Sequence, residues 1–116
     1  MKILLFISGL VLCILNYAYA ADSGFKSMLG NPYAEVRQTL LSQGWRSVDN
    51  PNITESSIYA QDIAQSGFTE VLDCISMQRD QCMFVLAKNQ KYIIIVTKDK
   101  KLYVESIKYQ KRLPVN

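Results

Sequence analysis

The stretch CISMQRDQCMFVLAKNQKYIIIVTKDKKLYVESIKY, residues 74–109, decides the fold. It contains three runs that are rich in β-branched and aromatic side chains, which suit a pleated sheet: 82–87, 92–97 and 102–109. The short polar segments Lys88-Asn89-Gln90 and Lys98-Asp99-Lys100-Lys101 separate these runs, and connections this short join antiparallel neighbours. The stretch therefore predicts an antiparallel β-meander.

The middle run has no polar side chain between Ile93 and Val96. A continuous apolar run of this kind predicts cover on both faces of the sheet, and one amphipathic helix covers only one face. The second face then needs either a further segment of the same chain or a partner molecule. An ordinary core, completed by an N-terminal segment that folds over the sheet, is the simpler expectation.

Cys74 and Cys82 lie eight positions apart, at the mouth of the first hairpin. In an oxidising compartment we expect them to form a disulfide, and closing so short a loop stabilises a fold by about 2–3 kcal/mol. Redox or metal chemistry is the alternative. The spacing is not C-x-x-C, the chain has no histidine, and the remaining cysteine, Cys13, lies in a leader segment. The pattern therefore favours a structural disulfide.

Residues 1–20 have the pattern of a signal peptide. Lys2 supplies a positive charge, residues 3–15 form an apolar core, and Ala18-Tyr19-Ala20 matches the cleavage pattern of small residues. The mature chain should begin at Ala21 and reach the periplasm or the medium, where disulfides persist. The alternative is an uncleaved anchor that extends through Ala21, although the apolar core is shorter than a normal membrane span.

Residues 21–116 are enough for one small domain, and its first regular element reads as a helix. Asn31 is a good N-cap, Pro32 suits the first helical position, and Gly44 suits the position after the helix end. Trp45 follows directly, and we expect it to fold back and pin the helix end on the sheet, with ligand stacking as the alternative. An apolar stripe at helical spacing supports the helix: Tyr33, Val36, Leu40 and Leu41.

The segment between this helix and the meander is harder to interpret. Residues 47–57 read as a loop, and residues 68–74 as the first strand of the sheet. Residues 58–65 fit either a short helix or a strand, and we favour strand-like or irregular structure. The predicted fold class is α+β: an N-terminal helix packed on an antiparallel sheet of three to four strands, with one disulfide.

The sequence lacks the usual residues of a reaction centre. Without histidine there is no triad base and no ligand of the commonest kind for metals. The spacing of Asp62, Glu70, Asp73 and Asp80 singles out no pair for acid–base hydrolysis. The chain contains neither a phosphate-binding glycine loop nor a nucleophile elbow. We therefore expect a protein that is not an enzyme and that uses no metal or other cofactor.

Charge changes sign along the chain. Residues 21–87 contain four Lys or Arg against eight Asp or Glu, whereas residues 88–116 contain eight against two. The basic C-terminal hairpin could bind an acidic protein, an anionic lipid or a cell-surface polymer. Its candidate partner-binding residues are Tyr92, Lys100, Lys101, Tyr103 and Tyr109.

Two other interpretations fit this hairpin. Tyrosine interleaved with lysine also resembles a surface on which nucleic acid bases stack, but export argues against a nucleic-acid partner. The ordinary alternative is a sheet whose edges are protected by solvated lysine turns.

Three short motifs follow one another along the chain: Y-x-x-x-R-x-x-L-x-x-x-G-W, then E-V-x-x-C, then C-x-F. They correspond to Tyr33, Arg37, Leu40 or Leu41, Gly44, Trp45, Glu70, Val71, Cys74, Cys82 and Phe84. In these residues the chain resembles a group of small secreted bacterial proteins, over most of the mature chain up to Ile107. The resemblance implies a periplasmic or secreted bacterial α+β domain and no assigned activity. In that group the loop between the cysteines is small and glycine-rich, whereas here it carries Met77, Arg79 and Asp80.

Two classes of function are consistent with these patterns. The first is a non-catalytic protein-binding module of the bacterial envelope, for instance an inhibitor or an immunity protein against a toxin delivered to the periplasm. It rests on the apolar middle strand, which needs cover on both faces of the sheet, and on the uneven distribution of charge along the chain. The second is a structural or surface-associated envelope protein that binds anionic lipid or cell-wall polymer through the basic hairpin. Salt should weaken the second kind of binding far more than the first.

Overall fold

The computed structural model describes residues 25–75 and 80–113. These residues form two α-helices, α2 (Tyr33–Ser42) and α3 (Ile58–Gln65), and a short 3₁₀ helix, η1 (Ile53–Glu55). They also form five strands: β1 (Arg46–Ser47), β2 (Val71–Ile75), β3 (Gln81–Lys88), β4 (Lys91–Lys98) and β5 (Tyr103–Gln110). The fold is α+β, as predicted. The predicted signal peptide, residues 1–20, and positions 76–79 of the loop between the cysteines lie outside the described residues.

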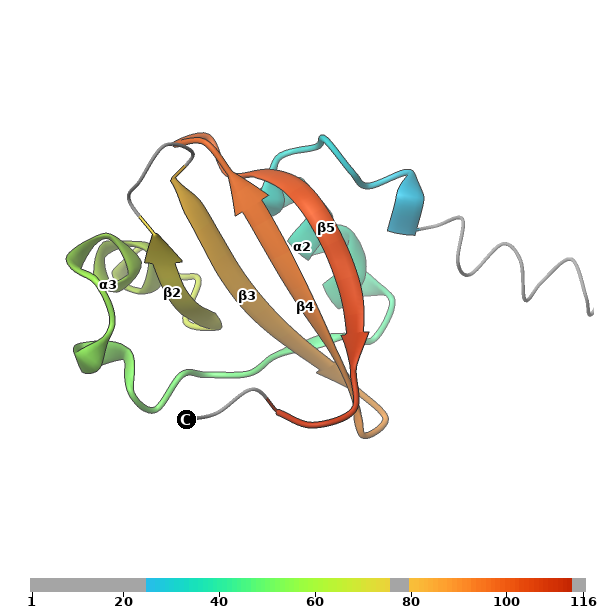
Figure 1. The fold of residues 1–116 in the computed structure, drawn as a ribbon. Coiled ribbons are helices and arrows are strands. Elements are labelled where there is room, and N and C mark those ends of the chain that lie inside the picture. The colour runs from blue at the N-terminus through green and yellow to red at the C-terminus, as the bar shows by residue number, and fades with distance from the viewer. Residues whose placement is uncertain (1–24, 76–79, 114–116) are drawn as a thin grey trace, which may run out of the picture.

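All strand pairs are antiparallel, and β3, β4 and β5 form the predicted meander (Figure 1). The sheet has five strands, so the expected three to four was too few. The missed strand is β1, which contributes two residues opposite Ala87 and Leu86 of β3. β2 pairs with the other half of β3, from Gln81 to Phe84. Both short strands therefore extend the sheet along one edge of β3, whereas β4 pairs with the other edge.

The segment for which we favoured strand-like or irregular structure is helical. α3 begins after Ser57, whose hydroxyl oxygen accepts a hydrogen bond from the backbone N–H of Ala60. The buried side chains of Ala60 and Ile63 lie three positions apart and face the core. The helix has only eight residues, so the periodic signal was too short to settle the prediction. Among the helices of the described ranges, none has the length and hydropathy that a membrane span requires.

Helix α2 differs from the prediction at its start. It is not the N-terminal element, because described residues from Phe25 onward precede it. The cap position is Pro32, not Asn31, because the Pro32 carbonyl accepts the first helical hydrogen bonds. The Asn31 amide instead donates to the carbonyl of Ser27, so it does not cap the helix.

The C-terminal end of α2 is closed by Gly44, which has a φ of +99°. The N–H of Gly44 donates to the Leu41 carbonyl, and the N–H of Trp45 donates to the Leu40 carbonyl. This pair of bonds is the Schellman motif, and it satisfies helix carbonyls that would otherwise lack partners. The motif turns Trp45 back onto the core, where its side chain is 6 % exposed.

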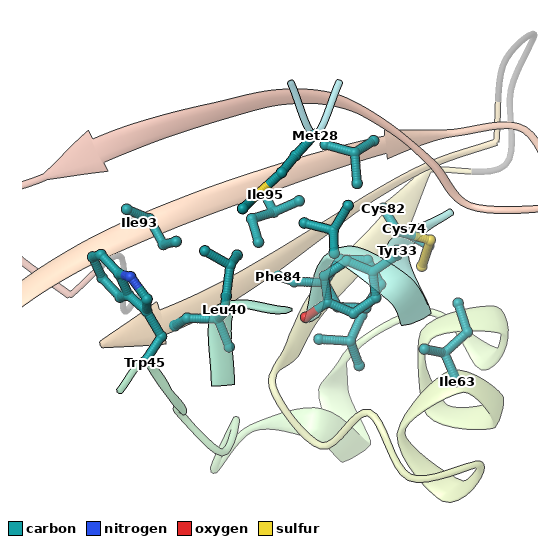
Figure 2. Close-up of a cluster of buried hydrophobic side chains, with 14 of the residues drawn as sticks. Met28, Tyr33, Leu40, Trp45, Ile63, Cys74, Cys82, Phe84, Ile93 and Ile95 are labelled. Carbon is teal, nitrogen blue, oxygen red and sulfur yellow. A yellow bond between two sulfur atoms is a disulfide. The ribbon is translucent and has the colours of Figure 1, made fainter. Parts of the chain in front are cut away.

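The hydrophobic core lies between the helices and one face of the sheet. Figure 2 shows Phe84, Ile93 and Ile95 pointing from the sheet to the side that also holds Leu40 and Ile63 of the helices. The ring of Tyr33 stacks on that of Phe84, with 3.8 Å between the centroids. The core therefore belongs to one face of the sheet.

The other face carries the alternate side chains of the central strands, because neighbours along a strand point to opposite sides. Val85 is buried there, whereas Met83, Ile94 and Val96 are partly exposed. Neither α2 nor α3 lies over this face (Figures 1 and 2). We expected both faces of the sheet to be covered, but the described helices cover only one of them.

Cys74 and Cys82 form the predicted disulfide. They stand directly opposite each other in the pairing of β2 with β3, and both side chains are buried. The bond therefore holds the short edge strand β2 to the centre of the sheet.

Candidate binding site

Glu70 carries a buried carboxylate, and its side chain is 0 % exposed. The hydroxyl of Tyr33 donates to its Oε2 atom at 2.6 Å. The Nε of Arg37 donates to the same oxygen at 2.6 Å, and Nη2 donates to Oε1 at 3.3 Å. Tyr33 and Arg37 are one turn apart on α2, so the cluster ties this helix to the segment that leads into β2.

The electrostatics of this cluster indicate a structural role. Burial, followed by the negative charge of Glu70, raises the pKa of Tyr33 far above its ordinary value, so Tyr33 is a neutral donor. The hydrogen bond to Glu70 raises the pKa of Arg37, which stays charged. The Arg37 guanidinium also lies 5.2 Å from the centre of the Phe68 ring. Tyr33, Arg37 and Glu70 all belong to the motifs of the resemblance, and here they form one closed network.

The five residues predicted to bind a partner do not form one site. Lys100 and Lys101 lie in the turn between β4 and β5, and Tyr103 pairs with Lys98 beside that turn. Tyr92 and Tyr109 lie at the opposite end of the same two strands.

Those two tyrosines also point to opposite faces of the sheet. Tyr109 stands opposite the buried Ile93, whereas Tyr92 is the neighbour of Ile93 along β4. Only Tyr109 therefore contributes to the site described next.

An aromatic cluster marks the end of the sheet where β3 turns into β4. The ring centroids of Phe25, Trp45 and Tyr109 lie 5.4–6.3 Å from one another. The Nζ atom of Lys88 lies 5.9 Å from the centre of the Trp45 ring. Tyr109 is 54 % exposed, whereas Trp45 is buried beneath it. The cluster thus presents an exposed tyrosine that packs on two other aromatic rings, with a lysine beside them.

Two hollows open beside this cluster. One, of about 610 Å³, is lined by Gln90, Lys91, Tyr109, Gln110 and Lys111. The other, of about 240 Å³, is lined by Trp45, Lys88, Asn89, Lys91 and Tyr109. They share Lys91 and Tyr109, and neither is lined by an Asp or a Glu. We call the residues lining these hollows, together with Phe25, the basic–aromatic end.

Local backbone structure holds this end in place. Asn89 and Gln90 connect Lys88 to Lys91 with φ values of +50° and +65°, the pattern of a type I′ hairpin turn. A Cβ atom added at Gly44 would lie 3.4 Å from Cε of Lys88, so the glycine allows this lysine side chain to pass close to the backbone. The lysines therefore project from a tight hairpin and not from a long loop.

Of the residues in this cluster, the sequence predicts Tyr109 as a binding residue and Trp45 as a structural anchor, but it does not predict that Lys88, Lys91 and Lys111 lie beside them. Lys88 is predicted only as a turn residue, and no role is predicted for Lys91 or Lys111. The excess of lysine after residue 88 was the available signal, but it did not show which lysines meet.

Within the described part of the chain, no three His, Cys, Asp or Glu residues lie together as metal ligands would. Comparisons with models of protein families, with curated proteins and with solved structures find no match to this chain.

Proposed function

We propose that the protein is an exported, non-catalytic binding protein of the bacterial envelope, of the inhibitor or immunity kind. Its partner is another envelope or secreted protein. The observation that carries the proposal is the basic–aromatic end, where two adjoining hollows combine lysines with an exposed tyrosine. Aromatic residues are enriched at the centres of protein interfaces, and charged neighbours set their specificity.

The lysines of the basic–aromatic end are available to a partner, because they form no ion pair within the described fold. Within residues 25–75 and 80–113, the structure gives no ion pair for Lys88, Lys91 or Lys111. The lysines and the amide side chains of Asn89, Gln90 and Gln110 offer hydrogen-bond donors to a partner. The closed network of Tyr33, Arg37 and Glu70 offers none of its charge in this way.

Affinity capture tests the proposal. The mature chain, residues 21–116 with its disulfide intact, is immobilised and exposed to envelope and secreted fractions, followed by washing at high salt. We expect one protein to be retained in stoichiometric amount. The double variant Lys88→Glu/Lys91→Glu should lose it, whereas Lys100→Glu/Lys101→Glu, with the same change of charge at the other end of the sheet, should keep it. Retention of no protein at any salt concentration would exclude this function.

Export is part of the proposal and has its own test. It is supported by the cleavage pattern Ala18-Tyr19-Ala20 and is consistent with the disulfide, which persists in oxidising compartments. Mass spectrometry of the protein recovered from the periplasm and the medium should show a chain that begins at Ala21. A full-length chain in the membrane fraction would indicate a retained anchor instead.

A second candidate function rests on the far end of the sheet. Lys98, Lys100 and Lys101 surround the exposed turn between β4 and β5, and such a turn suits a structural or surface-associated protein that binds anionic lipid or cell-wall polymer. Binding to anionic vesicles that disappears with salt, is lost in Lys100→Glu/Lys101→Glu and is accompanied by no captured protein would favour this function.

A further inference from the structure

Lys88 and Lys91 form a like-charge pair across two neighbouring strands, which is unfavourable for the stability of the sheet. They stand directly opposite each other as the last pair of the β3–β4 hairpin. Residues opposite each other on neighbouring strands share a face and lie close together, and like charges in such a pair are destabilising. Both lysines line the smaller hollow. A pair that costs stability, and for which the described residues supply no carboxylate partner, suggests a ligand that brings the missing negative charge.

Lys111 adds a third positive charge near Tyr109. It lines the larger hollow together with Lys91, and the exposed ring of Tyr109 belongs to both hollows. The three lysines are therefore grouped around one aromatic surface, in two connected depressions without a carboxylate.

We infer that this site binds an acidic polypeptide segment, whose Asp or Glu carboxylates pair with Lys88, Lys91 and Lys111 while its apolar atoms pack on Tyr109. The inference rests on the proposed function for the nature of the partner, since an acidic segment exposed on a secreted or envelope protein would be the ligand. It adds the chemistry by which that partner is recognised.

The arrangement favours a protruding segment over a flat anionic surface. A second group of lysines lies at the other end of β4: Lys98, Lys100 and Lys101. Along the strand, Lys91 and Lys98 are about seven residues or roughly 23 Å apart. A membrane or polymer surface would gain most from one broad basic face, whereas these charges are divided between two ends. The charges at the basic–aromatic end surround hollows, which accept side chains that project from a partner.

Trp45 makes the inference directly measurable. It is the only tryptophan of the chain, and its ring lies 5.9 Å from Nζ of Lys88 and 6.3 Å from the centroid of Tyr109. Carboxylates that draw Lys88 away from the indole should change the fluorescence of Trp45. The protein, purified after export, is titrated at low salt with a short blocked polyglutamate peptide, and polyglutamine of the same length serves as the neutral control.

We expect a saturable change with polyglutamate and none with polyglutamine. Lys88→Glu/Lys91→Glu should weaken the binding roughly tenfold or more, and Lys111→Glu should weaken it by a smaller factor. Lys100→Glu/Lys101→Glu should leave the affinity within about twofold, because those lysines lie outside the site. Thermal unfolding of each variant shows whether the fold is intact, and the two double variants are matched in their change of net charge.

Three outcomes would overturn the inference. The first is the absence of a saturable change with polyglutamate. The second is an equal loss of affinity in the two double variants, because it would show that net charge alone attracts the peptide. The third is binding of anionic vesicles through Lys88 and Lys91 that polyglutamate does not displace, because it would assign the site to a surface.

The two proposals fail separately. A captured protein that is still retained by Lys88→Glu/Lys91→Glu would remove the acidic-segment inference and leave the binding function standing. If polyglutamate binds at Lys88 and Lys91 while no protein is captured, the proposed binding function fails and the affinity of the site for acidic segments stands.

Discussion

At the scale of single residues, the Tyr33–Arg37–Glu70 network shows how a short motif acquires a physical meaning. The three residues are up to 37 positions apart in sequence, yet both oxygens of one buried carboxylate accept their hydrogen bonds. A buried carboxylate is stable only when such partners replace water. The motif therefore specifies the contact between α2 and the segment before β2.

Removal of Arg37 should be costly for the fold. Arg37→Ala leaves Glu70 buried without its charged partner, and we expect the free energy of unfolding to fall by about 3 kcal/mol, at the low end for buried pairs because Arg37 is partly exposed. Denaturant unfolding measures this loss. Arg46→Ala, at an exposed arginine of β1, is the control and should change the stability by less than about 0.5 kcal/mol. Equal effects of the two substitutions would contradict the structural role of the network.

Tyr33 should make the protein sensitive to alkaline pH. Burial, followed by the charge of Glu70, raises the pKa of Tyr33 in the folded state above its value in the unfolded chain. The folded state therefore holds this proton more tightly. The contribution of Tyr33 to stability is complete below pH about 10 and is lost as the pH rises further. Unfolding at about pH 8 and about pH 11 should show a steeper loss for the wild type than for Tyr33→Phe. Parallel losses in the two proteins would contradict this expectation.

At the scale of the elements, the β3–β4 hairpin combines a favourable turn with an unfavourable closing pair. Asn89 and Gln90 adopt the positive φ values that a two-residue turn needs, and asparagine tolerates that conformation. Lys88 and Lys91 then face each other across the strands. The hairpin thus keeps two like charges together at some cost to its own stability.

Replacement of one of these lysines by an acid should stabilise the protein. Lys91→Glu converts a like-charge pair into an opposite-charge pair, and we expect a gain of about 0.2–1 kcal/mol in the free energy of unfolding. Thermal or denaturant unfolding at low salt detects it. Lys100→Glu makes the same change of charge in the exposed β4–β5 turn and should give no comparable gain. If the two variants gained equally, relief of the overall positive charge would be the cause.

At the scale of the whole molecule, a small core on one face of the sheet depends on covalent support. The disulfide joins β2 to β3 at a directly opposed pair and closes a loop with a sequence separation of 8. Its reduction should lower the free energy of unfolding by about 2–3 kcal/mol. Denaturant unfolding with and without a reductant measures the difference. An unchanged midpoint would mean that the packing around Cys74 and Cys82 is sufficient by itself.

Much of this architecture was accessible from local sequence. The three long strands lie within one residue of the predicted runs, because their patterns and their turn residues depend only on neighbours along the chain. The end of α2 at Gly44 followed from the same local rules. The short elements were missed for the opposite reason. β1 exists only through its pairing with Leu86 and Ala87, and α3 is too short for a clear period.

By itself, the sequence determined the α+β class, the meander and the disulfide, because composition, spacing and local conformational preference carry that information. The tertiary structure alone decided which side chains share a site. Sheet register separated Lys100, Lys101 and Tyr103 from Tyr109, and it brought Tyr109 beside Trp45, which is 64 positions earlier in the chain. The tertiary structure also placed Lys88, Lys91 and Lys111 in the two hollows that share the ring of Tyr109. Contacts between residues so distant depend on strand pairing and helix packing across the whole fold, which no local pattern encodes.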